Sequence, residues 1–172
     1  MSCSVSDLTI NISRLSEGTH QYVLEVEPEN LELDSRFVGR VLVRATIEKT
    51  GRQLHLRADL QAKGQFTCDR CLDEFEQSLL TRFEIVYVTE EGVRQGSSDG
   101  EVQYISADKT ILDIGEDVRQ FLILAVPQKL LCNDDCRGLC TVCGSNRNRV
   151  NCKCANKEAD PRWEVLKKVS LN

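Results

Sequence analysis

Eight of the nine cysteines in this chain lie in short-spaced groups, a pattern typical of metal ligands. Cys68 and Cys71 are separated by two residues, and six more cysteines fall between positions 132 and 154. One tetrahedral zinc ion takes four thiolates at about 2.3 Å each, so eight thiolates are enough for two sites. The sequence therefore predicts one or two zinc ions, held by some or all of these ligands: Cys68, Cys71, Cys132, Cys136, Cys140, Cys143, Cys152 and Cys154.

The clearest ligand set combines Cys140-x2-Cys143 with Cys152-x-Cys154. The x2 spacing lets two thiolates reach one ion, and a glycine directly after it permits a tight turn. Residues 137–160 have few apolar side chains and would need a metal to become ordered. The other four cysteines can form a second site. The spacing leaves open an interleaved pairing, an iron–sulfur cluster in place of zinc, and a redox switch in the C-D-R-C pair.

The remaining composition favours a protein of the cytoplasm. No run of 18 apolar residues exists, and the first residues have neither a basic nor an apolar secretory region, so we expect neither a membrane span nor export. In a reducing compartment, close cysteine pairs are more often metal ligands than disulfides.

Charge is distributed unevenly along the chain. Residues 1–136 carry 14 Lys/Arg and 24 Asp/Glu, net −10, whereas residues 137–172 carry 8 and 3, net +5. A basic, cysteine-bearing tail suggests an anionic partner, although docking of the tail on the acidic body would satisfy the same electrostatics.

The segment between the two ligand pairs of the tail carries amide and cationic side chains suited to RNA. Such a loop, held by metal, can contact phosphates, riboses and base edges. The alternative is a solvated turn whose asparagines satisfy its own backbone. No nucleophile elbow, phosphate-binding loop or zinc-protease motif is present, so we expect a non-enzymatic protein. The candidate nucleic-acid-binding residues are Asn146, Arg147, Asn148, Arg149 and Lys153.

These groups must be positioned by a body whose first 105 residues show mostly strand periodicity. Alternating apolar and polar side chains predict a hairpin from residues 41–47 and 54–60, joined by a turn at 49–52. Gly64 is expected to interrupt the second strand. Shorter or weaker patterns predict further strands near 8–12, 22–26, 79–89 and 102–105, with a loop at 90–100.

The period changes after residue 112. Asp113 is a candidate N-cap for a helix that Pro127 ends, and a second, short helix is expected after Asp160-Pro161. The predicted fold is α+β: a mainly antiparallel β sheet or partly open barrel, one covering helix and a zinc-stapled C-terminal tail. We place the boundary between residues 1–131, the body, and 132–172, the cysteine-rich tail ending in the short helix.

At its cysteines the chain resembles the YceD family, the large ribosomal RNA subunit accumulation proteins. The matching motifs are F-T-C-D-R-C-L at 66–72, C-N-D-D-C-R-G-L-C-T-V-C-G-S-N-R-N at 132–148, C-K-C at 152–154 and D-P-R-W at 160–163. The resemblance implies a factor for accumulation or processing of the 23S ribosomal RNA precursor and for large-subunit assembly.

Its partners would then be ribosomal RNA precursor or large-subunit ribosomal proteins, and the sequence does not determine the oligomeric state. The alternative is a zinc-stabilised protein-interaction module or thiol sensor without direct RNA contact.

Overall fold

The computed structural model describes residues 8–89 and 102–154, and these fall into two compact units. The first unit, here called the body, comes from residues 1–66 and 75–128. The second, here called the tail unit, comes from residues 67–74 and 129–172. The two Cys68–Cys71 ligand candidates thus belong to the same unit as the C-terminal cysteines, although the sequence separates them widely.

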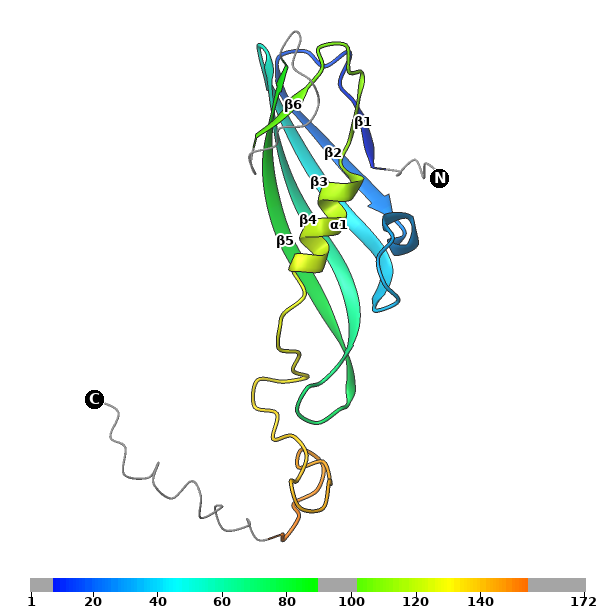
Figure 1. Cartoon of the computed structure of the whole chain (residues 1–172), viewed down its shortest axis with the longest axis vertical. Coiled ribbons are helices and arrows are strands. Elements are labelled where there is room, and N and C mark those ends of the chain that lie inside the picture. The colour runs from blue at the N-terminus through cyan, green and yellow to red at the C-terminus, as the bar shows by residue number, and fades with distance from the viewer. Residues whose placement is uncertain (1–7, 90–101, 155–172) are drawn as a thin grey trace, which may run out of the picture. The chain divides into compact units, whose positions relative to one another are not determined.

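An open five-stranded sheet forms most of the body (Figure 1). Its order is β2-β3-β4-β5-β6, with antiparallel β2–β3 and β3–β4 pairs and a parallel β5–β6 pair. Within the described residues the edge strands do not pair with each other, so the sheet does not close into a barrel. The predicted fold class is confirmed. The strands are β2 (Gly18–Val26), β3 (Phe37–Thr50), β4 (Gln53–Thr67), β5 (Glu74–Thr89) and β6 (Val102–Ile105).

The β3–β4 hairpin follows the alternation in the sequence. Thr50 pairs with Gln53, which leaves a two-residue turn of Gly51 and Arg52. Gly51 has a φ of 54°, a conformation that two-residue hairpin turns require and that glycine adopts without strain. Inward-facing side chains such as Val43, Ile47 and Leu56 are fully buried, so the apolar face of this hairpin forms the centre of the core.

Gly64 does not interrupt β4, and the prediction of a break there was wrong. The strand continues to Thr67 because the missing side chain makes room on the buried face, where the Phe66 ring occupies the space that a Cβ at position 64 would need. Phe66 in turn lies 6.2 Å from Phe75 of β5, measured between ring centroids.

One face of the sheet is covered by the single helix of the described residues, α1 (Gly115–Leu124), as predicted (Figure 1). The Phe121 ring of α1 stacks on Phe83 of β5 at 4.7 Å, and Val118 and Leu122 are fully buried. Sequence analysis missed β7 (Ile111–Asp113), which pairs antiparallel with the short strand β1 (Thr9–Asn11). Pro28–Leu31 forms a 3-10 turn.

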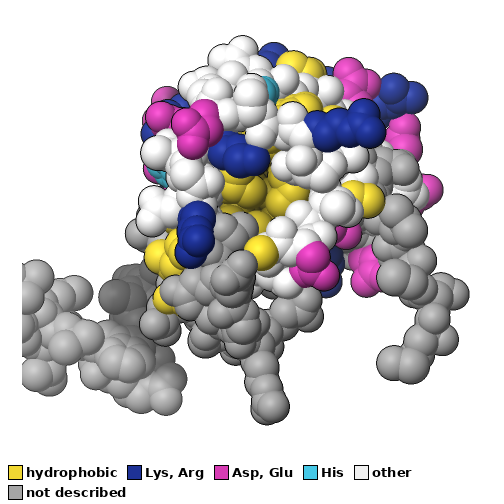
Figure 2. Space-filling view, turned by 90° about the horizontal axis from the view of Figure 1, so that it is seen from above, with side chains coloured by type: hydrophobic (Ala, Val, Ile, Leu, Met, Phe, Trp, Pro, Cys, Tyr) yellow, Lys and Arg dark blue, Asp and Glu magenta, His cyan; other side chains and the backbone are white. Residues whose placement is uncertain are grey.

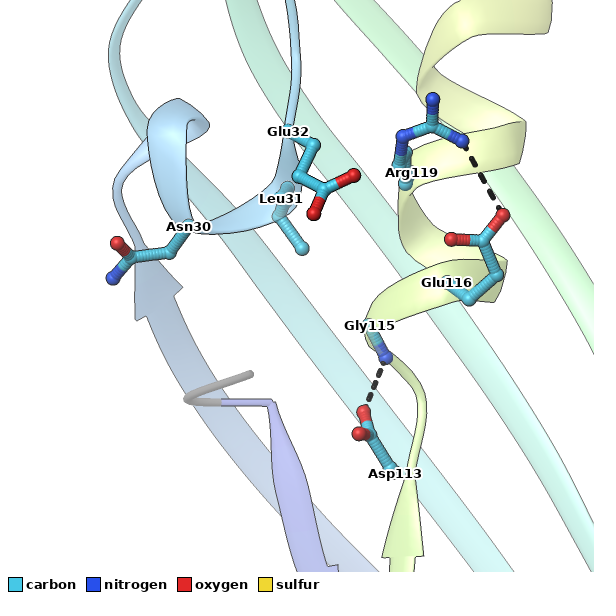
Figure 3. Close-up of a pocket in the computed structure, with 7 residues that line it drawn as sticks. All are labelled: Asn30, Leu31, Glu32, Asp113, Gly115, Glu116 and Arg119. Carbon is cyan, nitrogen blue, oxygen red and sulfur yellow. Dashed lines mark hydrogen bonds and ion pairs between the residues drawn. The ribbon is translucent and has the colours of Figure 1, made fainter. Parts of the chain in front are cut away.

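The start of α1 differs by one residue from the prediction. Ile114 occupies the N-cap position and makes no side-chain cap, while Asp113 Oδ1 accepts a 2.8 Å hydrogen bond from the Gly115 backbone N–H (Figure 3). Asp113 therefore still satisfies one free N–H group of the first turn. The Ile114 side chain does not cap the helix and is instead fully buried in the core.

Among the described residues, no helix is long and apolar enough to cross a membrane. The helix expected after Asp160, the loop at 90–100 and Cys3 lie outside the described residues.

Candidate metal centres

The eight clustered thiols come together as two separate groups of four within the tail unit. In each group all four sulfur atoms lie within 4.8 Å of one another, and all eight thiols are free. The interleaved pairing left open by the spacing is not the arrangement found. Cluster 1 consists of Cys68, Cys71, Cys132 and Cys136, and cluster 2 of Cys140, Cys143, Cys152 and Cys154.

The sulfur positions of cluster 1 fit a tetrahedral metal ion. Cys68 Sγ lies 3.8 Å from Cys136 Sγ, and Cys71 Sγ lies 3.5 Å from Cys132 Sγ. Four sulfurs at about 2.3 Å from one zinc ion would be about 3.8 Å apart along each tetrahedral edge. Three of the four thiols are buried and Cys132 is exposed. Cluster 1 can therefore hold a metal ion largely shielded from water.

Both Cys-x2-Cys turns have the same backbone conformation. In the first, Leu72 N donates to Cys68 O and Cys68 N donates to Asp73 O, both at 2.9 Å. In the second, Gly144 N donates to Cys140 O at 2.9 Å and Cys140 N to Ser145 O at 2.8 Å. The residue after the second cysteine is left-handed in each turn, with φ values of 61° for Leu72 and 71° for Gly144. This repeated turn aims two thiols at one point in both clusters.

Cluster 2 is the more exposed of the two. Cys143 and Cys154 are exposed, Cys152 is half-buried, and Cys140 is buried. The Val142 backbone N–H donates to Cys140 Sγ at 3.5 Å, and the Ser145 hydroxyl lies 2.9 Å from Cys143 Sγ. Donors of this kind stabilise thiolates and orient them for a metal. Cluster 2 can hold a metal ion with less protection from solvent than cluster 1.

Hydrogen bonds make some of these thiols easy to ionise. Burial raises the pKa of Cys68, but backbone N–H groups of Cys132, Cys71 and Arg70 outweigh it and bring the pKa to about 6. In cluster 2, the hydroxyl and backbone N–H of Ser145 lower the pKa of Cys143 to about 6.

The thiolates formed first make the remaining thiols harder to ionise. The contact with Cys71 and burial raise the pKa of Cys132 to about 12, and Cys143 has the same effect on Cys154, whose pKa is also about 12. Because like charges at this distance repel, neither cluster can carry four thiolates at neutral pH without a bound cation. The donor set therefore suits a metal that binds thiolates.

Three of the five predicted nucleic-acid-binding residues have partners inside the tail unit. Asn146 Nδ2 donates to Asp73 Oδ2 at 2.8 Å, and the Arg149 guanidinium forms a 3.1 Å ion pair with Asp73 Oδ1. Asn148 Nδ2 donates to Cys136 Sγ at 3.2 Å, and its Oδ1 accepts from the Arg137 backbone N–H at 2.8 Å. These contacts tie the loop between the ligand pairs of cluster 2 to the segments that supply cluster 1.

The other two, Arg147 and Lys153, are exposed and form no side-chain hydrogen bond or ion pair with any residue that the structure describes. Residues 137–154 contain four Lys/Arg and no Asp/Glu. The charges of Arg147 and Lys153 are therefore not neutralised by an ion pair within the described part of the tail unit.

Sequence reasoning missed the residues that support the thiols. Asp73 follows the first Cys-x2-Cys by two positions, but its partners are more than seventy residues further along the chain. Ser145 and Asp73 stand at equivalent ends of the two turns, and comparing the two C-x2-C motifs position by position could have drawn attention to both.

Residues 56–170 match the family model described as large ribosomal RNA subunit accumulation protein YceD. The chain belongs to the YceD family. The match covers the second half of the body and nearly all of the tail unit, so it includes every cysteine of both clusters. The family is named for accumulation of the large ribosomal RNA subunit rather than for a catalysed reaction.

Two curated relatives carry the same description. A chloroplastic YCED homolog 1 from Arabidopsis thaliana is 23% identical over 152 residues, which are 72% of this chain and 47% of the relative. The corresponding protein from Zea mays is 27% identical over 146 residues, 67% of this chain and 49% of the relative. The chain thus spans about half the length of these relatives. No solved structure matches it.

Proposed function

We propose that this protein is a non-catalytic, zinc-stabilised factor that binds precursor large-subunit ribosomal RNA through its tail unit and promotes its accumulation. Membership in the YceD family is the observation that carries the proposal. Zinc is the proposed ion because both clusters offer four cysteine thiolates, which is the donor set of closed structural zinc sites. Such a site supplies folding free energy and no chemistry.

The RNA contact is assigned to the segment that zinc would order. Arg147 and Lys153 would contact phosphate groups, since neither has an intramolecular partner among the described residues. Asn146, Asn148 and Arg149 would hold the loop in place through Asp73 and Cys136, with any RNA contact of their own being additional.

Free thiols and thiolate metal sites suit a reducing compartment, and we propose the cytoplasm, where precursor ribosomal RNA would be met. Large-subunit ribosomal proteins are the second class of proposed partner.

A docking module for basic proteins, without RNA contact, is the competing function. Ion pairs on the sheet work against it, because they neutralise carboxylates that would attract such a partner. Three of these pairs are Arg57–Glu84, Arg82–Asp59 and Lys63–Glu76.

Charge reversal at Arg147 and Lys153 tests the RNA contact. The double variant Arg147→Glu, Lys153→Glu should bind a precursor large-subunit RNA fragment more weakly, with the slope of log affinity against log salt flatter by about one to two units. Cells carrying it should contain less large-subunit RNA. Arg149 is left intact because its reversal would also break the ion pair with Asp73.

The matched control is the double variant Arg44→Glu, Lys129→Glu. It changes net charge equally at two exposed residues outside the basic segment. If both double variants bind RNA like the wild type while folded and metal-loaded, RNA binding by this loop is excluded and the protein-docking function is favoured.

A further inference from the structure

The turn end of the β3–β4 hairpin carries a cavity of about 210 Å³ that lies wholly within the body. Three cationic residues from different segments line it: Lys49 near the end of β3, Arg52 in the hairpin turn, and Lys109 between β6 and β7. Figure 2, which looks onto this end, shows Lys and Arg side chains around a hollow with a hydrophobic floor. We call this cavity the basic pocket.

Most other cations in the described part of the body are paired with carboxylates. Six other Lys or Arg side chains of the body are neutralised by ion pairs with Asp or Glu, namely Arg36, Arg40, Arg57, Lys63, Arg82 and Arg119. Neither Lys49 nor Lys109 has an ion pair with any residue in the described ranges. Asp108, next to Lys109 in sequence, instead accepts a hydrogen bond from the Ser106 hydroxyl. The basic pocket therefore keeps a positive charge on a unit that is acidic overall.

One cation of the pocket is held in place by the fold. Lys49 Nζ donates a 2.7 Å hydrogen bond to the Leu15 carbonyl, and the lysine is half-buried. An ammonium group has three donors, so two remain after this bond. Lys49 is thus positioned before any ligand arrives, which lowers the entropy cost of binding.

The rest of the lining indicates the chemistry of the ligand. Ile12, Leu54 and Ala107 supply apolar surface between the cations. The volume is several times the ~30 Å³ that one water molecule occupies, yet it is below the ~300 Å³ usual for pockets that enclose a whole cofactor. A phosphate group with part of an attached sugar matches both the charge and the size.

We propose that the basic pocket binds a phosphate group on an organic carrier, and that in the protein's proposed function the carrier is RNA. With RNA as the carrier, the inference rests on the proposed function. It adds an RNA contact on the body to the RNA contact proposed for the tail unit. The same chemistry could come from a free nucleotide, and the experiment separates the two sources.

Neutralising Lys109 tests the RNA contact. Lys109→Gln should weaken binding of a precursor RNA fragment by about threefold to tenfold, as expected for the loss of one charge-assisted phosphate contact, and flatten the salt slope by about one unit. Arg44→Gln is the matched control, because Arg44 is another exposed lone cation of the body. Ala107→Glu adds a carboxylate to the wall without removing a cation and should have the same effect as Lys109→Gln.

A second arm uses adenosine monophosphate and inorganic phosphate in place of RNA. Saturable shifts of the Gly51 and Lys109 amide resonances with the nucleotide, lost in Ala107→Glu, would support the phosphate site even if RNA affinity is unaffected, and would identify free nucleotide as its source. If wild-type protein does not bind RNA, the proposed function fails and this arm alone decides the pocket. Unchanged RNA binding in both pocket variants, together with no nucleotide shifts, would overturn the inference.

Discussion

At the scale of single residues, the two Cys-x2-Cys turns share one backbone conformation but differ in how well their residues suit it. Gly144 occupies a left-handed position at no steric cost, whereas Leu72 occupies the equivalent position with a Cβ that disfavours it. The Leu72 side chain is also 62% exposed, so it gains little from burial. The sequence predicts the turn at Gly144, but nothing in it predicts a left-handed leucine.

Placing glycine at position 72 and removing it from position 144 should change the free energy of metal binding in opposite directions. Leu72→Gly should strengthen it by up to about 1 kcal/mol, because relief of about 1–2 kcal/mol of left-handed strain exceeds the extra entropy that glycine loses on folding. Gly144→Ala should weaken it by a similar amount. Competition with a chromophoric chelator measures both. Weaker metal retention in Leu72→Gly would mean that the exposed leucine makes a stabilising contact, and the strain explanation would be wrong.

Residue types alone also explain part of the site. The spacing predicts the eight ligand thiols and their division into two groups of four. It does not predict which cysteine pairs share a metal ion. The second role of Asn146 and Arg149 could not, because it depends on Asp73, which sheet folding brings near from a distant part of the sequence.

At the scale of elements, α1 carries a carboxylate into a partly buried polar contact with the sheet. Asp117 accepts long hydrogen bonds from Gln103 Nε2 at 3.4 Å and the Tyr87 hydroxyl at 3.5 Å. Burial raises the pKa of Asp117, and these two hydrogen bonds offset only part of that effect. The same burial and the neighbouring Asp117 charge raise the pKa of Tyr87.

Asp117 should therefore make stability depend on pH in a defined direction. Because the folded protein keeps this proton to higher pH than the unfolded chain, stability falls as pH rises from the usual carboxyl pKa through the raised one, and stays lower above it. Asp117→Asn cannot ionise and should be more stable than the wild type at pH 7, with a gain that shrinks towards pH 4. Denaturant unfolding at several pH values measures this difference.

Glu116→Gln is the control, since it removes an exposed charge from the same first turn of the helix. The Asp117→Asn variant could instead prove no more stable to unfolding than the Glu116→Gln variant at any pH. That result would show that the helix dipole, rather than burial, dominates the energetics of Asp117.

The long elements of the body were predictable, and of the short strands β1 and β6 were predicted whereas β7 was not. β3, β4 and α1 have enough residues for their periods to be recognised. β7 has three residues, too few to show a period, and it exists because it pairs with β1. Gly64 reads as a break in the sequence, whereas its packing against Phe66 is visible only in three dimensions.

At the scale of the whole molecule, the two units are stabilised by different means. The body has a continuous apolar core, whereas the described tail unit has few buried apolar side chains apart from its cysteines. The tail unit should therefore depend on metal and the body should not.

Metal removal and single cysteine substitutions test this difference. Protein purified under reducing conditions should contain two zinc ions per chain, by elemental analysis. The Cys143→Ser variant should lose one ion and show faster amide hydrogen exchange from about residue 137 to 157. The Cys71→Ser variant should lose the other ion and show faster exchange in residues 67–74 and 129–136 together. Strong chelation should produce both effects while the sheet amides stay protected. Cooperative unfolding of the whole chain on chelation, or a metal-free protein with an equally ordered tail, would contradict the model of two independently stabilised units.

The separation of the cluster 1 ligands along the chain affects the order of events during synthesis. Cluster 2 needs only residues 140–154, whereas cluster 1 joins thiols that are 61 and 68 positions apart. Closing a loop roughly five times longer costs about 1.4 kcal/mol more in chain entropy unless the intervening strands and helix have already folded. In the zinc-bound form that we propose, a newly made chain would load cluster 2 by itself and cluster 1 only after the body is complete. Occupancy of cluster 1 would then report that the rest of the protein has folded.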